Sequence, residues 1–267
     1  MTVMPASTYR KYGRAPFDVA VLHGGPGACG EMAPVARELA SGQGVLEPFQ
    51  TATSIGGQIN ELRSILETHA KVPVTLIGFS WGAWLGALFA SDCPEFVKKL
   101  ILVGSGPFDE SYSTTIQKTR LDRLGDDERI EFEELMKRVT DPTAGDASSA
   151  FGRIGQLILN ADSYDPDLSQ LEAVDCRVGI FQSVWAEAAA LRKSGKLLQR
   201  AARIRCPVIA IHGDYDPHPA EGVKNPLSGI LSRFRFVMIK NCGHTPWIER
   251  QAAKPFFRLL KDELNCP

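Results

Sequence analysis

The chain has 267 residues, of which 44% are hydrophobic and 23% charged, and its formal net charge is −1. Such a chain is long enough to bury one large core and to carry an inserted subdomain. The near-zero charge leaves no basic surplus to neutralise phosphates, so we expect no nucleic-acid partner.

Signals for membrane insertion and export are also missing from the sequence. No apolar run approaches the ~18 residues that a membrane span needs. The first residues, MTVMPASTYRKYGRAPF, lack the apolar stretch of a secretion signal. The six cysteines are scattered without a CxxC pair, which favours reduced thiols. We therefore predict a cytoplasmic protein without membrane contact, and the sequence leaves its oligomeric state open.

Short apolar runs alternate with amphipathic segments from residue 17 to 105 and again from residue 206. The expected strands cover 17–25, 44–50, 72–79, 97–105, 206–213 and 233–240. The expected helices cover 31–42, 56–70, 81–93, about 220–232 and 248–263. Strands that alternate with helices pair in parallel through right-handed crossovers. The predicted fold class is therefore α/β, with a mostly parallel sheet flanked by helices.

Residues 107–205 interrupt this alternation, because their apolar residues recur only at helical spacing. We predict that this stretch is a helical cap, or lid, inserted between two strands of the sheet. The core domain then consists of residues 1–106 and 206–267. The charge-rich segment 120–138 of the cap is expected to form a solvated helix face.

The stretch GFSWGAW, residues 78–84, places one serine between a predicted strand and a predicted helix. A Gly-x-Ser-x-Gly sequence at such a turn is typical of a nucleophile elbow, in which the two glycines relieve crowding. Ser80 would then project from the end of the strand, close to the free N–H groups of the helix. The alternative is that Ser80 simply caps the helix N-terminus.

Three more segments follow predicted strands: HGGPG at 23–27, HGDYDPHP at 212–219 and NCGHTPWIE at 241–249. Serine, then acid, then histidine is the chain order expected when a serine nucleophile is activated. Because open α/β sheets build their sites at the carboxyl ends of the strands, these segments are expected to meet at one edge. A glycine-rich loop such as 23–27 also lets backbone approach a substrate closely.

Two acids compete for the role beside the histidine. Asp214 lies at the first step of its loop, where a carboxylate usually braces the turn. Asp216 lies two residues farther out and has more reach toward the histidine loop. The alternative is that Asp216, which precedes Pro217, caps a helix. We predict that Asp216 is the catalytic acid.

With these four segments in this order, the chain resembles an α/β-hydrolase with a helical cap. HGGPG, GFSWG, HGDYDPHP and CGHTPW are similar to the proline iminopeptidase group of that superfamily. The resemblance implies Ser80 as nucleophile, His244 as base and Asp216 as acid. It also implies an oxyanion hole made by the backbone N–H groups of Gly25 and Trp81.

The chain departs from the iminopeptidases in two places. EPFQTATS, residues 47–54, stands where that group carries an Asp-Gln-Arg-Gly type sequence, and no glutamate pair in the lid matches a reader of a free amino terminus. The segment before HGGPG is also short, so we expect little room for antiparallel strands there. We therefore expect esters of short to medium acids to be cleaved faster than prolyl anilides.

Three further residues are candidate substrate contacts. Gly24 belongs to the glycine loop, His218 lies near Asp216 at the expected pocket mouth, and Trp185 of the lid faces either the substrate or a neighbouring helix. His23 is expected to orient the glycine loop by hydrogen bonding. No cluster has metal-ligand spacing and no GxGxxG follows a strand, so we expect no metal and no cofactor.

The sequence thus predicts a serine hydrolase that cleaves a small carboxylic ester or amide through an acyl-enzyme on Ser80. Two alternatives stay open. One is a proline iminopeptidase-like aminopeptidase, and the other is a binding protein or lyase that kept the pocket with little hydrolytic turnover. In each case the partner is a small molecule.

Overall fold

The computed structural model describes residues 8–140, 147–171 and 174–266. A seven-stranded sheet forms the centre, in the order β1-β4-β2-β5-β6-β8-β9. Its strands are β1 (Tyr9–Tyr12), β2 (Phe17–Leu22), β4 (Gly44–Pro48), β5 (Val74–Phe79), β6 (Val97–Val103), β8 (Val208–Gly213) and β9 (Phe234–Ile239). Only β1 pairs in antiparallel fashion; the other neighbours are parallel. The structure confirms the mostly parallel sheet that the sequence predicts.

The antiparallel edge strand corrects one expectation. The segment before the glycine loop was expected to leave little room for such a strand, yet β1 pairs with β4 from Tyr9↔Pro48 to Tyr12↔Val45. Four residues suffice because side chains anchor the edge. The Tyr12 hydroxyl donates a hydrogen bond of 2.7 Å to Glu47, a buried carboxylate of β4. A short, polar edge strand of this kind carries little hydrophobic periodicity for a sequence to reveal.

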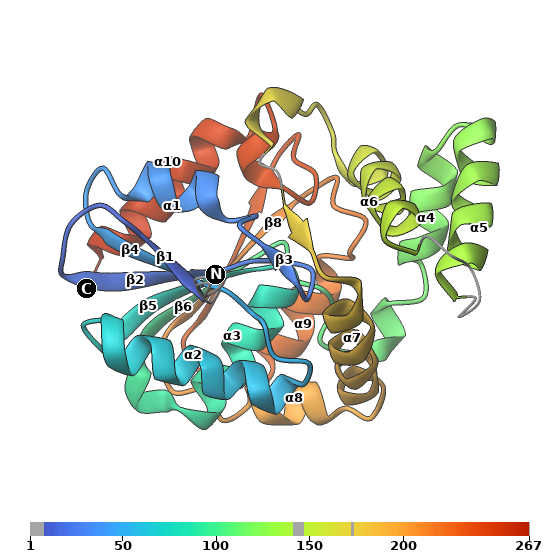
Figure 1. Cartoon of the computed structure of the whole chain (residues 1–267). Helices are drawn as coiled ribbons and strands as arrows, with labels where there is room; N and C mark the ends of the chain where they lie inside the picture. Colours follow the sequence, from blue (N-terminus) through green and yellow to red (C-terminus); the bar gives the residue numbers. More distant parts are fainter. Residues whose placement is uncertain (1–7, 141–146, 172–173, 267) are drawn as a thin grey trace, which may run out of the picture.

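Helices cover both faces of the sheet (Figure 1). On one face lie α1 (Ala33–Leu39) and α10 (Ala253–Asn265), and on the other lie α2 (Ile55–His69), α3 (Trp81–Asp92) and α9 (Glu221–Ser228). Successive strand residues alternate between the two faces: Leu76 packs with α2 and α3, and Ile77 packs with α1 and α10. Because both faces of the central strands are buried, those strands appear as mainly apolar runs in the sequence, for example VTLIGF in β5.

The insert between β6 and β8 has two parts. Three helices, α4 (Ile116–Arg123), α5 (Asp126–Thr140) and α6 (Ala147–Asp162), share a small apolar core of their own and stand beside the sheet (Figure 1). The next two, α7 (Val178–Lys193) and α8 (Lys196–Ala201), contribute instead to the core that α2 and α3 share with the sheet. The cap boundaries at 107 and 205 stay a prediction, but only α4–α6 have a separate core.

Two local features of the insert were not foreseen. The helical stretch at the end of the insert is interrupted at Gly195, between α7 and α8, and the φ of 72° there is readily adopted only by glycine. A two-residue strand β7 (Asp175–Cys176) pairs with β3 (Ala28–Cys29), which directly follows the glycine loop. This small sheet ties the insert to the loop that carries HGGPG.

Two other expectations concern the chain as a whole. In the described part of the chain no helix combines the length and the apolar character needed to cross a bilayer. Among the described residues, the thiols of Cys93, Cys206, Cys242 and Cys266 form no disulfide. The latter finding agrees with the expected reduced thiols.

Candidate active site

Ser80 occupies a strained turn between β5 and α3. Its φ of 51° and ψ of −113° lie where residues other than glycine rarely occur. The turn depends on its glycines, since a Cβ on Gly78 would lie 2.2 Å from the Gly82 oxygen and one on Gly82 would lie 2.4 Å from the Leu22 oxygen. Within the described residues, the Ser80 side chain makes no helix-capping hydrogen bond, which argues against the capping alternative.

His244 and Asp216 meet at the same edge of the sheet. His244 Nδ1 lies 2.8 Å from Asp216 Oδ2, and the His244 ring packs against Phe79, the residue before Ser80, with 4.9 Å between ring centroids. Because a carboxylate only accepts, Nδ1 donates this bond and His244 Nε2 keeps its lone pair. The acid, the histidine and the serine loop are thus brought together as the sequence predicts.

The electrostatics of the pair suit a base. Burial alone would raise the pKa of Asp216, but the neighbouring His244, His218 and His212 hold it well below its usual range. Burial alone would lower the pKa of His244, but the charge and hydrogen bond of Asp216 raise it. The Asp216 side chain is 0% exposed, yet it stays ionised because the neighbouring imidazoles hold its pKa low, and it lies next to an imidazole that readily takes a proton.

A second imidazole, His218, binds the other oxygen of the same acid. Asp216 Oδ1 lies 2.7 Å from His218 Nδ1 and accepts the His218 backbone N–H at 2.9 Å. The bond to the His218 backbone N–H closes a turn over Pro217. Asp216 therefore stabilises the local backbone, as the capping alternative supposed, and contacts His244 as well. The two imidazole rings lie 4.5 Å apart.

Asp214, the competing acid, contacts Cys242 and Lys240. Its Oδ1 accepts the Cys242 backbone N–H at 3.3 Å, and its Oδ2 lies 3.4 Å from Lys240 Nζ. It therefore braces the start of the histidine loop, as its place in the sequence suggests, while Asp216 makes the contact with His244.

The glycine loop is held from both sides. His23, which is fully buried, lies with Nδ1 2.8 Å from the Gly24 oxygen, and its Nε2 accepts the Gln50 N–H at 3.2 Å. Burial lowers the pKa of His23 to about 4, so the ring is neutral and Nδ1 donates. The Gly24 N–H donates to Glu31 Oε2 at 2.8 Å. This N–H is therefore engaged with protein, and Gly24 is not among the described residues that line the cavity.

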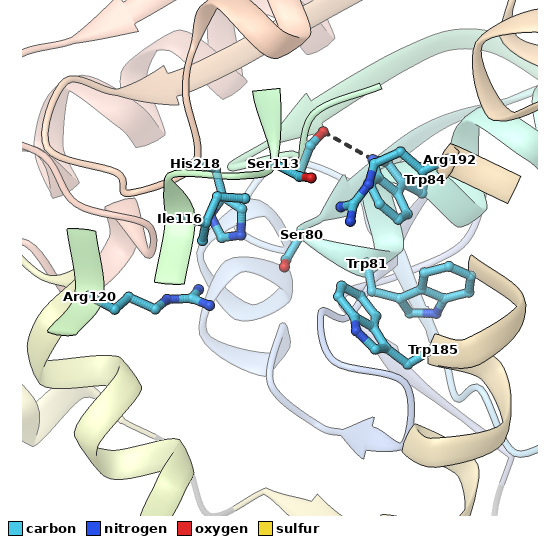
Figure 2. Close-up of a pocket in the computed structure, with 10 residues that line it drawn as sticks. Ser80, Trp81, Trp84, Ser113, Ile116, Arg120, Trp185, Arg192 and His218 are labelled. Atoms are coloured by element: carbon cyan, nitrogen blue, oxygen red, sulfur yellow. Dashed lines mark hydrogen bonds between the residues drawn. The ribbon is translucent and has the colours of Figure 1, made fainter. Parts of the chain in front are cut away.

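The cavity beside Ser80 has a volume of about 120 Å³. Figure 2 shows the serine between His218 and Arg120 on one side and three tryptophans on the other. The lining consists of Ser80, Trp81, Trp84, Gly106, Ser113, Ile116, Arg120, Trp185, Arg192 and His218. Trp84 and Trp185 are stacked, with ring centroids 6.0 Å apart and an angle of 4° between the planes. This side of the cavity is thus aromatic, and Trp185 and His218 lie on the cavity as the sequence suggests.

Two arginines of the cavity were missed by the sequence analysis. Arg120 binds Asp162 with both Nε and Nη2, at 2.8 and 2.6 Å. Arg192 donates from Nε to Glu110 at 2.6 Å and lies 5.4 Å over the Trp84 ring. Arg120 begins the charge-rich segment that was expected to be solvated. For Arg192 a signal existed, because a residue seven positions after Trp185 falls on the same helix face.

The histidine loop is bound to the end of α6. Glu249, whose side chain is buried, accepts backbone N–H bonds from Gly243 at 2.9 Å, from Tyr164 at 2.8 Å and from Asp165 at 2.7 Å. The His244 backbone N–H donates a hydrogen bond of 2.8 Å to the backbone oxygen of Asp162. The loop that carries His244 is therefore fixed by the insert as well as by the sheet.

Asp216, His218 and His244 also form a group with metal-ligand chemistry, since their ligand atoms lie within 4.8 Å of one another. Hydrogen bonds already account for this closeness, because both Nδ1 atoms donate to Asp216. A bound ion would have to displace both protons. The expectation of no metal and no cofactor stays a prediction.

Known proteins resemble this chain along nearly its whole length. The family described as alpha/beta hydrolase fold matches residues 49–251. A relative from Pseudomonas putida, 2-hydroxy-6-oxononadienedioate/2-hydroxy-6-oxononatrienedioate hydrolase 2, is 28% identical and covers 96% of this chain and 91% of its own length.

Solved structures with the same fold include enzymes of different activities. A bromoperoxidase from Bacillus anthracis is 18% identical with a TM-score of 0.64 and covers 97% of this chain and 95% of its own. A proline iminopeptidase from Mycobacterium smegmatis is 16% identical with a TM-score of 0.61 and covers 96% of this chain and 93% of its own. These matches confirm the predicted fold class, while the finer likeness to iminopeptidases stays a prediction.

Proposed function

The chain belongs to the alpha/beta hydrolase fold family, and from that premise we propose that it is a serine hydrolase that cleaves a small carboxylic ester or amide. The family match and the hydrolase relative from Pseudomonas putida together show that the protein is an enzyme of the hydrolase type. One observation carries the finer proposal: Ser80 stands in a positive-φ elbow at the sheet edge where His244 is bound to an ionised Asp216.

In the proposed reaction, His244 Nε2 takes the proton of the Ser80 hydroxyl as the oxygen attacks the carbonyl carbon. The backbone N–H groups of Gly25 and Trp81 stabilise the oxyanion. His244 then gives the proton to the leaving group, and a water that it deprotonates releases the acyl group from Ser80. Asp216 keeps the imidazole in the tautomer that this cycle needs.

Substrate contacts are proposed at His218 and Trp185, which line the cavity with Ser80. Gly24 takes a different role from the one first expected. Its N–H is bound to Glu31, so we propose that it fixes the glycine loop instead of contacting the substrate. The indole of Trp81 donates to Gln58 at 3.1 Å, which holds the residue after the nucleophile in place.

A fluorophosphonate probe tests the nucleophile directly. We expect it to label Ser80 in the folded protein and to leave a Ser80→Ala variant unlabelled. A panel of p-nitrophenyl esters and aminoacyl anilides then tests the substrate class, and we expect short to medium esters to exceed prolyl anilides in kcat/KM. The absence of labelling would favour the binding-protein alternative, and faster cleavage of the prolyl compound would favour an aminopeptidase.

A second candidate rests on the two arginines. The Pseudomonas putida relative is named for an unsaturated oxo-dioate, and hydrolysis at a ketone must break a carbon–carbon bond. Arg120 and Arg192, although each is bound to a carboxylate of the protein, bring two cations to the cavity, and Trp84 and Trp185 give it an aromatic wall for a conjugated chain. Loss of the near-ultraviolet absorbance of such a dioate, without turnover of simple esters, would establish this candidate over the first.

A further inference from the structure

Asp216 holds two imidazoles, and the proposed reaction uses one of them. Oδ2 binds His244, the base, at 2.8 Å. Oδ1 binds His218 twice, through Nδ1 at 2.7 Å and through the backbone N–H at 2.9 Å. His218 is therefore fixed as firmly as the base is, although the cycle described above gives it no proton to carry.

The protonation of His218 follows from its partner. An ionised carboxylate has no proton to give, so His218 Nδ1 is the donor of this bond. In the neutral ring, Nε2 then keeps a lone pair and accepts. Burial lowers the pKa of His218 to about 4, and His244 and Arg120 oppose a second proton while Asp216 favours one. At neutral pH the ring therefore presents an acceptor.

This acceptor faces the substrate cavity. His218 lines the cavity with Ser80, its side chain is 11% exposed, and its ring lies 4.5 Å from that of His244. Figure 2 shows the imidazole beside the serine hydroxyl. His218 Nε2 makes no hydrogen bond to any residue in the described ranges. The Nε2 of the nearby His212, by contrast, is hydrogen-bonded to the His218 backbone oxygen at 2.8 Å. When a ligand enters the cavity, a hydrogen-bond acceptor on its wall loses contact with water. Unless the ligand supplies a donor in place of the water, this desolvation weakens binding.

We propose that His218 selects substrates with an O–H or uncharged N–H donor on the atom next to the scissile carbonyl, such as 2-hydroxy acyl esters. The inference rests on the proposed function, because Ser80 fixes where the carbonyl lies. A substrate with an apolar group at this place would leave Nε2 desolvated and unpaired. Sites built to bind a polar group discriminate strongly against analogues that lack it, so we expect a preference of about tenfold or more.

Three methyl esters test this preference: lactate, 2-methoxypropanoate and propanoate. They share one acyl skeleton and no charge, and only lactate carries a donor. His218→Asn is the informative variant, because the Asn side-chain amide retains a donor near Nδ1 for Asp216 but has nothing at Nε2. We expect the wild type to favour lactate over 2-methoxypropanoate about tenfold in kcat/KM and the variant to show a ratio near one. Any loss caused by disturbing Asp216 lowers the kcat/KM of all three esters equally and leaves their ratios unaffected.

A second variant guards against misfolding or a general loss of activity. His218→Gln places an amide oxygen near the position of Nε2, so we expect it to recover part of the lactate preference. Equal ratios in the wild type and both variants, or a wild type indifferent to the hydroxyl, would overturn the inference.

Binding separates this inference from the proposed function. In a Ser80→Ala background, ligand-observed NMR gives the Kd of methyl lactate and of methyl 2-methoxypropanoate without turnover. We expect the added His218→Asn change to weaken lactate binding about tenfold more than 2-methoxypropanoate binding. If the wild type hydrolyses none of the esters but this difference appears, the hydrolase proposal fails and the role of His218 stands. If hydrolysis depends on Ser80 and the difference is absent, the role of His218 fails alone.

Discussion

The sheet edge and the inserted helices build the same cavity in different ways. Each group that we propose to react follows a strand of the sheet and is held by main-chain geometry, as Ser80 is held by its positive φ and its two glycines. The insert contributes side chains from helix faces, among them those of Arg120, Trp185 and Arg192. The comparison teaches that the proposed bond cleavage depends mainly on main-chain geometry at the sheet edge, while the proposed choice of substrate depends on side chains, those of the insert and His218 of the β8 loop.

The Ser80→Ala substitution is the strongest test of this comparison, because it removes the proposed nucleophile from the sheet edge. Alanine fits the same turn but has no hydroxyl, so we expect turnover to fall on the order of 10⁴-fold or more. Thermal unfolding followed by circular dichroism should show a melting temperature close to that of the wild type. A variant that keeps full esterase activity would contradict the assignment of the nucleophile.

The two acids of the β8 loop provide the next test. Asp216→Asn removes the acceptor of His244 Nδ1–H and favours the wrong tautomer, so we expect kcat to fall by roughly two to four orders of magnitude. The proposed cycle requires neutral His244, so we expect activity to be lost as the pH falls through the pKa of that group. Since Asp216 raises this pKa, the acidic limb of residual kcat/KM should move to lower pH in the variant.

Asp214→Asn is the matched control for that experiment. Asp214 braces Cys242 and lies near Lys240, so its loss should lower thermal stability with a smaller effect on kcat. Measuring both variants on one ester decides the matter, and the reverse order of kcat losses would show that Asp214 is the catalytic acid.

The insert is tested by Arg192→Gln, with Lys193→Gln as a control that removes the same charge one residue farther along α7. If Arg192 binds an anionic part of the substrate, kcat/KM for an ester with a free carboxylate should fall about tenfold more than for its neutral analogue. Lys193 is exposed and absent from the cavity lining, so its variant should treat both esters as the wild type does. Equal losses on the two esters would remove Arg192 from anion recognition.

What the sequence predicts follows the same division. The strand runs, the order of helices and the four loops at the sheet edge depend on local patterns, and the structure places Asp216 and His244 together as those patterns suggest. The missed features depend on contacts between distant segments. The strand β7 forms only because residues 175–176 meet residues 28–29, and Arg120 is partly buried at the cavity because Asp162 binds it. No local pattern distinguishes such an arginine from its solvated neighbours.

The smallest expected effect concerns stability at the glycine loop. Burial raises the pKa of Glu31 to about 7, although part of the residue remains accessible to solvent. An acid whose pKa is higher in the folded than in the unfolded chain contributes its full stabilisation at pH values below its unfolded-state pKa, near 4.5. This contribution is lost as the pH rises through the folded-state pKa of about 7. Glu31→Gln carries no charge, so its melting temperature should exceed that of the wild type at pH 9 by about 2–6 °C and match it near pH 5. Glu38→Gln, at an exposed acid paired with Lys261, should show no such dependence on pH.

Glu249 has a consequence for how a substrate enters. Because its carboxylate joins the Gly243 N–H to those of Tyr164 and Asp165, the histidine loop and the end of α6 form one mechanical unit. A ligand that entered by lifting α4–α6 would pull His244 away from Ser80 at the same time. In such an open form Ser80 would lack its base. The nucleophile would therefore be activated only after α4–α6 had returned over the bound substrate.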